Sequence, residues 1–377
     1  MSRITAPSEG AQDTRAPAHG PHPAAPDTAP ARHGAWVGRI AVLVLVPLLL
    51  LSVVLAIGLG TATVHPADTL RHLWAAVAGG TIGADEATEH QIVWNLRTPR
   101  VLLAGTVGAG LGAVGTAIQA MVRNPLADPF VLGVSSGASV GAVMVGVLGA
   151  FSVLGVYAVS AGAFLGALGA TLLVYAASAG RGGVTPLRLV LTGVALSFAF
   201  QAVMGVVVYF APSGEATSTV LFWSMGGFGA ATWGSLPLVV IVVLTGVLVL
   251  RALSRPLDVL TMGDETAASL GVDTARLRRG LFFLTAAMTG AMVAVSGAIG
   301  FVGLVVPHVV RILVGAAHQR VLLVAPLAGA VFMVWVDLAS RAVVAPRELP
   351  LGFITALVGV PVFVLLLHRR GYLFGGR

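Results

Sequence analysis

Long apolar segments alternate with short polar connections along most of the chain. Each segment holds roughly 20 residues, the length that an α-helix needs to cross about 30 Å of hydrocarbon. The pattern predicts an all-α, multi-pass membrane domain of about ten transmembrane helices over residues 37–370. The segment at 304–316 is short for a full span. The approximate bounds are 37–60, 101–122, 130–150, 157–178, 186–211, 233–254, 280–302, 304–316, 321–343 and 351–368.

The longest polar interruption of this pattern runs from Arg255 to Arg279. It reads as two short helices, because Pro256 suits a first helical position, Asp264 can cap a second start and Gly271 suits a stop. Apolar residues are interleaved with charges here, so neither helix suits a lipid environment. Two interpretations remain open from spacing alone: a helix lying in the headgroup region, or a docking element for a soluble partner.

A second polar segment, 61–100, separates the first two spans. Leu70, Leu73, Trp74 and Val77 follow helical spacing behind a possible cap at Asp68, which predicts an amphipathic helix on the membrane surface. The segment ends in Arg97-Thr98-Pro99-Arg100 at the start of the second span.

The chain begins with a tail, residues 1–36, that is rich in Pro, Ala, Gly and His and lacks an apolar period. We expect this tail to be disordered, as a cytoplasmic extension like the short C-terminal tail at 371–377. Because no small-residue cleavage site ends the apolar run that follows, we interpret that run as a retained membrane span and not as a signal peptide.

Composition supports a membrane protein and limits its chemistry. Hydrophobic residues make up 57% of the chain and charged residues 10%, which excludes an ordinary soluble domain. The chain has no cysteine, and all 22 of its basic residues are arginine. The phosphate-binding GxxxxGK[ST] loop needs a lysine. We therefore expect no ATP or Mg²⁺ site and no catalytic residue in this chain, so any ATP used would be hydrolysed by a separate subunit.

The arginines also predict the orientation. With ten spans, both termini lie on one side, and seventeen of the 22 arginines fall on that side. Positive residues collect in the cytoplasm, so the termini and the Arg255–Arg279 stretch are predicted to be cytoplasmic, in the inner membrane. Five arginines remain on the other side, where they could pair with headgroup phosphates or with carboxylates of an extracytoplasmic protein: Arg71, Arg97, Arg100, Arg341 and Arg347.

Glycine spacing predicts how the spans pack. The chain has 48 glycines, and several recur four residues apart, a spacing that lets helix backbones approach closely within lipid. This indicates a compact bundle but no particular function. The spaced glycines are Gly108 and Gly112, Gly133, Gly137 and Gly141, and Gly162 and Gly166.

Five motifs, in order, resemble those of the FecCD-type permeases: RTPR, QAMVRNPLADPFVLGVSSGASVG, GDETAASLGV, SGAIGFVGLVVPHVVR and RELPLGFITALVGVPVF. These proteins are the membrane subunits of ATP-binding-cassette (ABC) importers for iron–siderophore complexes, haem and cobalamin. The resemblance covers roughly residues 37–370. It implies a type II importer permease of ten helices, a second permease copy or homologous permease, two ATPase subunits and an extracytoplasmic binding protein.

The resemblance also implies roles for particular residues. The loop between the sixth and seventh helices would couple to the ATPase through Leu257, Leu260, Gly263, Asp264, Glu265, Thr266 and Gly271. The binding protein would dock on Arg97, Arg100 and Arg341. The fifth helix would line the path through Thr192, Ser197 and Gln201, behind a cytoplasmic gate that includes Gly182 and Gly183.

Together these expectations predict a transport protein that catalyses no reaction itself. It would import a ferric-siderophore complex by alternating access. Haem or cobalamin is the alternative substrate. A proton- or sodium-driven carrier is the alternative mechanism, but it would need acidic groups near the midplane. Asp337 is the one candidate, and Arg341 lies one turn away, where a neutralising i,i+4 pair is expected.

Overall fold

The computed structural model describes residues 29–60, 63–180, 184–211 and 223–369. The elements in these ranges are helices, and one helix corresponds to each predicted span, so the predicted all-α class is confirmed. These helices are α1 (Ala29–Gly58), α4 (Thr98–Met121), α5 (Val134–Leu148), α6 (Ala158–Ser178), α7 (Pro186–Tyr209), α9 (Leu236–Ala252), α12 (Thr274–Ser296), α13 (Val302–Val314), α14 (His318–Ala342) and α15 (Leu351–Arg369).

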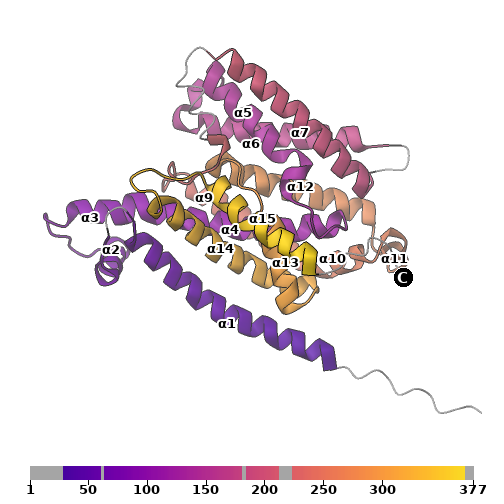
Figure 1. Cartoon of the computed structure of the whole chain (residues 1–377), viewed down its shortest axis with the longest axis horizontal. Coiled ribbons are helices and arrows are strands. Elements are labelled where there is room, and N and C mark those ends of the chain that lie inside the picture. The colour runs from indigo at the N-terminus through magenta and orange to yellow at the C-terminus, as the bar shows by residue number, and fades with distance from the viewer. Residues whose placement is uncertain (1–28, 61–62, 181–183, 212–222, 370–377) are drawn as a thin grey trace, which may run out of the picture.

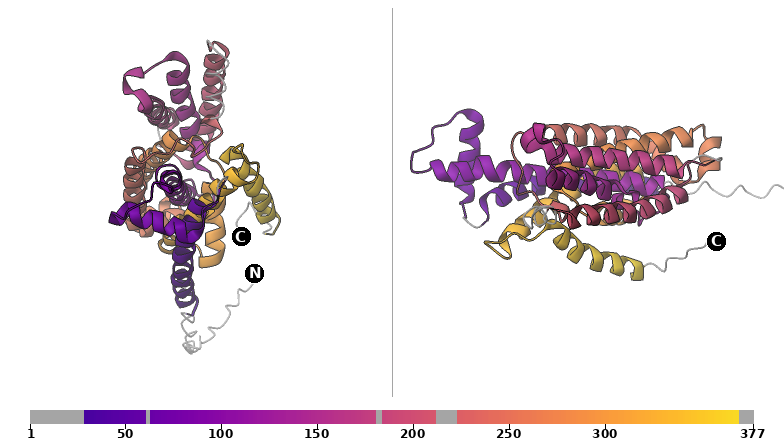
Figure 2. Two further views of the ribbon diagram at one scale, coloured as in Figure 1. Left: turned by 90° about the vertical axis from the view of Figure 1, so that its left-hand side faces the viewer. Right: turned by 90° about the horizontal axis from the view of Figure 1, so that it is seen from above.

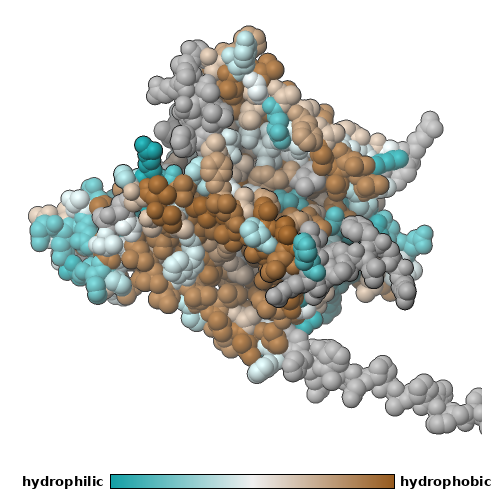
Figure 3. Space-filling view, viewed as in Figure 1, coloured by the Kyte–Doolittle hydropathy of each residue, from teal (hydrophilic) through white to brown (hydrophobic). Residues whose placement is uncertain are grey.

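Within the described residues, six helical stretches are long and apolar enough to cross a membrane. A seventh is obtained if α9 is joined to the short helix α10 (Ser254–Thr261), which bends away by 61°. α5, α13 and the apolar part of α15 are shorter. Figure 3 shows apolar side chains over the middle of the visible face and hydrophilic ones toward its ends.

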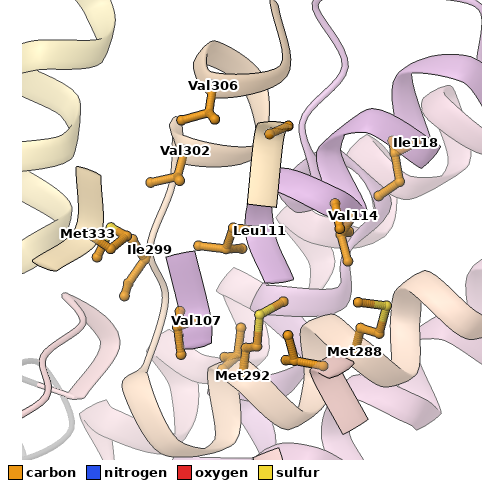
Figure 4. Close-up of a cluster of buried hydrophobic side chains, with 14 of the residues drawn as sticks. Val107, Leu111, Val114, Ile118, Met288, Met292, Ile299, Val302, Val306 and Met333 are labelled. Atoms are coloured by element: carbon orange, nitrogen blue, oxygen red, sulfur yellow. The ribbon is translucent and has the colours of Figure 1, made fainter. Parts of the chain in front are cut away.

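α4 is the central helix of the bundle, and almost every residue along it is buried. α14, α13, α12 and α9 pack around it. Figure 4 shows the resulting core: Val107, Leu111 and Val114 of α4 face Met288 and Met292 of α12 and residues near α13. Because lipid gives no hydrophobic driving force between helices, this contact area and the closeness of the backbones hold the bundle together.

The spaced glycines other than Gly133 lie at close helix contacts, which confirms the predicted packing. A Cβ added at Gly108 of α4 would meet the backbone of Gly329 on α14. Gly137 and Gly141 of α5 likewise face the backbones of Gly166 and Gly162 on α6. Any larger side chain would force these helices apart.

The bundle has two distinct ends (Figures 1 and 2). At one end lie α2 (Pro66–Ala78), α3 (Ala87–Gln91) and the π-helical turn η1 (Ile92–Arg97). At the opposite end lie α10 and α11 (Asp264–Ser269). The first turn of α1 and the last turn of α15 also lie toward this α11 end (Figure 1). We call the two ends the α2 end and the α11 end.

Several boundaries differ from the sequence-based expectation. α1 begins at Ala29, so the predicted tail ends in helix, and residues 1–28 and the C-terminal tail lie outside the described residues. α12 begins at Thr274, capped by Asp273, and ends at Gly297, whose φ of +64° stops the helix. α2 is capped by His65, and Asp68 lies in its first turn.

Candidate functional site

Two of the three predicted docking arginines hold the C-terminus of α1. Arg97 donates from one terminal nitrogen to the carbonyl oxygens of Ile57 and Gly58, both at 2.9 Å. Arg341 donates to the carbonyl oxygen of Ala56, also at 2.9 Å. The last carbonyls of a helix have no partner within the helix. The two guanidinium groups therefore supply donors that the end of α1 needs.

The third arginine joins three elements of the α2 end. Arg100 donates from Nε to Oδ1 of Asp337 at 2.8 Å, and from its two terminal nitrogens to both oxygens of Glu348 at 2.7 and 2.9 Å. Arg341 donates from Nε to the other oxygen of Asp337, at 3.1 Å. We call Arg100, Asp337, Arg341 and Glu348 the ion cluster. Two positive and two negative groups neutralise each other, which is the condition for burying charge at low cost.

The ion cluster confirms the predicted pair of Asp337 and Arg341 and adds two members to it. Asp337 is fully buried between two guanidinium groups. The hydrogen bonds from Arg100 hold the pKa of the Glu348 carboxyl below its ordinary value. Sequence reasoning missed the pairing of Arg100 because its partners are far away in the chain. The acidic residues flanking Arg341 were the one available signal.

Docking through these arginines stays a prediction. Arg97, Arg100 and Arg341 are only 7%, 9% and 6% exposed, so a binding protein would reach them only after their internal contacts open. Arg347, in the loop that carries Glu348, is exposed.

A cavity of about 890 Å³ lies beside Glu348. Its walls come from α5, the start of α6, the end of α12, the segment 223–235 and the loop 347–350. Polar groups in the wall include Tyr157, Thr232 and Ser296. No sequence motif pointed to it, because the cavity is assembled from segments that are distant in the chain.

The Arg255–Arg279 stretch forms the two short helices that were predicted, α10 and α11, before α12 begins. Pro256 is the third residue of α10 and not the first, and Gly263, not Asp264, precedes α11 as its cap. Gly271 ends α11 with a φ of +80°, which favours glycine. We call residues 257–272 the knob.

Five of the seven predicted coupling residues divide into two sets, and the other two, Gly263 and Asp264, are half-buried. Leu257 and Leu260 are fully buried on the side of α10 that packs on α4 and α14. Glu265, Thr266 and Gly271 are exposed, as are the apolar side chains of Met262 and Leu270. The first set anchors the knob to the bundle, and the second presents a mixed polar and apolar surface outward.

Polar contacts fix the orientation of the knob. Asp258 of α10 accepts from the backbone nitrogen of His318 at 2.9 Å and lies 2.6 Å from its ring nitrogen Nδ1, so it caps the start of α14. Asp264 of α11 binds Arg278 of α12 at 2.7 Å and lies 3.7 Å from Arg123 in the connection after α4. These contacts attach the knob to the helix ends beneath it.

The predicted path residues lie on α7 and differ in their exposure. α7 starts as expected, with Thr185 as its cap and Pro186 first. Ser197 donates back to the carbonyl of Gly193 and lies near Gly133, whereas Gln201 is exposed and Thr192 is half-buried. The predicted gate residues Gly182 and Gly183 lie outside the described residues. Their roles, like those of the α7 residues, stay predictions.

Comparison with known proteins gives a consistent set of relatives. The model of the FecCD transport family matches residues 48–369. The hemin transport system permease protein HmuU of Yersinia pestis is 39% identical over 86% of this chain and 94% of its own. The iron(3+)-hydroxamate import system permease protein FhuB of Bacillus subtilis is 36% identical over 89% of this chain and 86% of its own.

The fold has a counterpart among solved structures. A protein described as a metal-chelate type ABC transporter in an inward-facing conformation superimposes with a TM-score of 0.76 at 32% sequence identity. The match covers 87% of this chain and 99% of that one.

Proposed function

Because the chain belongs to the FecCD transport family and is an ABC importer permease, we propose that it carries ferric-siderophore complexes across the inner membrane. The proposed mechanism is alternating access at an interface with a second permease copy or a homologous permease. Two ATPase subunits would bind ATP and Mg²⁺ and act on the knob. An extracytoplasmic binding protein would deliver the substrate at the α2 end.

The knob is the observation that supports this proposal most directly. Its polar outer surface includes Glu265 and Thr266, while Leu257 and Leu260 fix it to the bundle. An element that receives force from a soluble partner needs both an exposed contact surface and a rigid attachment. A helix lying on headgroups needs only the apolar side, so the firm attachment favours a docking role.

The proposed orientation places the α11 end in the cytoplasm. Both ends of the described chain lie toward it (Figure 1). Five arginines lie beside the knob: Arg123, Arg255, Arg276, Arg278 and Arg279. This agrees with the excess of positive charge on cytoplasmic loops. The α2 end then faces the binding protein.

The ferric-siderophore assignment rests on relatives. They include permeases of iron(3+)-hydroxamate and Fe(3+)-citrate import systems. Hemin and cobalamin are the alternative substrates, because relatives of similar identity belong to hemin and cobalamin systems. Asp337 does not support a proton-driven carrier, because two arginines neutralise it.

Purification tests whether the chain works with an ATPase, and uptake measurements test which substrate it carries. The chain, purified from native membranes, is expected to bring an ATPase subunit with it. A deletion strain is expected to lose uptake of radioactive iron given as hydroxamate or citrate chelates, and to regain it with the wild-type chain. Loss of hemin or cobalamin uptake alone would move the substrate to that alternative. Absence of any associated ATPase would overturn the importer mechanism.

A further inference from the structure

One guanidinium group connects the knob to the start of α7. Arg278 lies on the first turns of α12, and its terminal nitrogen Nη2 donates to Oδ1 of Asp264 in the knob at 2.7 Å. The other terminal nitrogen, Nη1, donates to the carbonyl oxygen of Val184 at 3.4 Å. Val184 directly precedes Thr185, the cap of α7. The knob and α7 are therefore joined through one side chain.

The burial of Arg278 sets it apart from its neighbours. Arg278 is 5% exposed, whereas Arg276 and Arg279 on the same helix face solvent. A charge held away from water needs a compensating partner, and Asp264 provides it. A side chain needed only for solubility or topology would have no reason to lie inward.

α7 is suited to receive a movement at this end. Leu189 and Gly193 are its buried residues among those described. Its contacts within the subunit are with α5, α6 and the turn after α4, so it lies at the edge of the bundle and not in its core. Arg123 reinforces the arrangement, because it lies beside Gly263 and Asp264 and belongs to the connection that leads to the turn η2 (Pro129–Leu132). That turn packs on α7.

We propose that Arg278 is a positioning residue that transmits displacement of the knob, through Asp264 and the Val184 carbonyl, to the N-terminal end of α7. This inference rests on the proposed function, because the displacement comes from the ATPase. When the ATPase moves the knob, Arg278 moves the residue that starts α7. Without that link, ATP is hydrolysed but α7 does not respond.

The absence of cysteine allows a direct test. Leu187, an exposed residue at the start of α7, is replaced by cysteine in an otherwise unchanged chain. The chain is assembled with its ATPase in lipid nanodiscs, and the rate of maleimide labelling is measured with and without Mg-ATP. ATP hydrolysis is measured in the same samples, which separates a failure of transmission from a failure to assemble.

In this background, Arg278→Gln is expected to reduce the ATP-dependent change in labelling rate by about tenfold, a typical size for coupling between two sites, while hydrolysis continues. Arg279→Gln is the matched control and should respond like the parent. Asp264→Asn removes the ion pair with Arg278 from the knob side, and it is used as the test variant if Arg278→Gln does not assemble. The double variant should reduce the ATP-dependent change in labelling rate no further than the more impaired single variant does, as expected for two residues of one link.

Two results would contradict the inference in different ways. If the assembled Arg278→Gln variant shows the same ATP-dependent labelling as the parent, the role of Arg278 is overturned and the importer function is unaffected. The same holds for Asp264→Asn if it is the variant used. A parent that neither binds the ATPase nor responds to Mg-ATP would overturn the proposed function and, with it, this inference.

Discussion

Arg100 and Asp337 lie 237 positions apart in the chain, yet Nε of Arg100 donates to Oδ1 of Asp337 over 2.8 Å. The contact joins α4 to α14 at the α2 end, and Arg341 and Glu348 complete it. Polar groups within apolar surroundings are costly unless paired. This ion cluster therefore fixes the arrangement of the two helices as well as neutralising their charges.

Removing Asp337 should destabilise the folded bundle strongly. Asp337→Ala leaves Arg100 and Arg341 close together without their shared carboxylate, and breaking a buried pair in this way costs about 3–5 kcal/mol. We expect a lower unfolding temperature in detergent and lower expression. Asp68→Ala, which affects an exposed pair with Arg71, should change neither, because exposed ion pairs contribute little. Equal effects of the two variants would contradict the assignment.

The Glu348 carboxyl should make the stability of the α2 end depend on pH. Its pKa is lowered in the folded state, chiefly by the hydrogen bonds from Arg100. The stabilisation is therefore complete above the ordinary glutamate pKa of about 4.3 and is lost as pH falls through the lower folded value. Wild type should exceed Glu348→Gln in unfolding temperature at neutral pH, and the difference should shrink below that ordinary value. A constant difference down to acid pH would contradict this.

Local sequence signals predicted the helices well, because each signal acts within a few residues. Apolar segments gave one helix for each predicted span, Thr185 and Pro186 gave the start of α7, and the polar stretch gave the two helices of the knob. One boundary error arose where a single backbone angle decides. The positive φ of Gly297 ends α12 well before the apolar residues end.

The sites were harder to predict, because they depend on contacts between distant segments. Sequence spacing identified Asp337 and Arg341 as a pair but could not bring Arg100 to them. The family resemblance grouped Leu257 with Glu265 as coupling residues, although one is buried and the other exposed. The hydrogen bond from Arg278 to Val184 joins residues 94 positions apart, and no periodic pattern in the sequence indicates it.

The glycine contacts predict a sharp difference between two similar substitutions. A Cβ at Gly108 would collide with the backbone of Gly329 and lie 2.8 Å from Cβ of Met333. Gly108→Ala should therefore cost about 1–3 kcal/mol, as overpacking does. Gly169 in α6 has no atom within 4 Å of the added carbon, so Gly169→Ala should be neutral or gain about 0.5–1 kcal/mol. Thermal unfolding of the two purified variants measures this, and a tolerated Gly108→Ala would show that the helices can separate without loss.

The outer surface of the knob should determine affinity for the ATPase without affecting the fold. Glu265 is exposed on α11, and the burial of Leu257 and Leu260 keeps the knob attached whatever stands at position 265. Glu265→Arg is expected to weaken binding of the purified ATPase by about tenfold, the effect of one energetically important interface residue. The unfolding temperature should stay at the wild-type value.

Arg279→Glu provides the control, because it also reverses an exposed charge at the α11 end but lies outside residues 257–272. It should bind the ATPase like wild type. If the Glu265→Arg variant binds the ATPase normally, or if Arg279→Glu weakens ATPase binding equally, the ATPase does not bind the knob at α11. The contact surface would then have to be sought elsewhere on the α11 end.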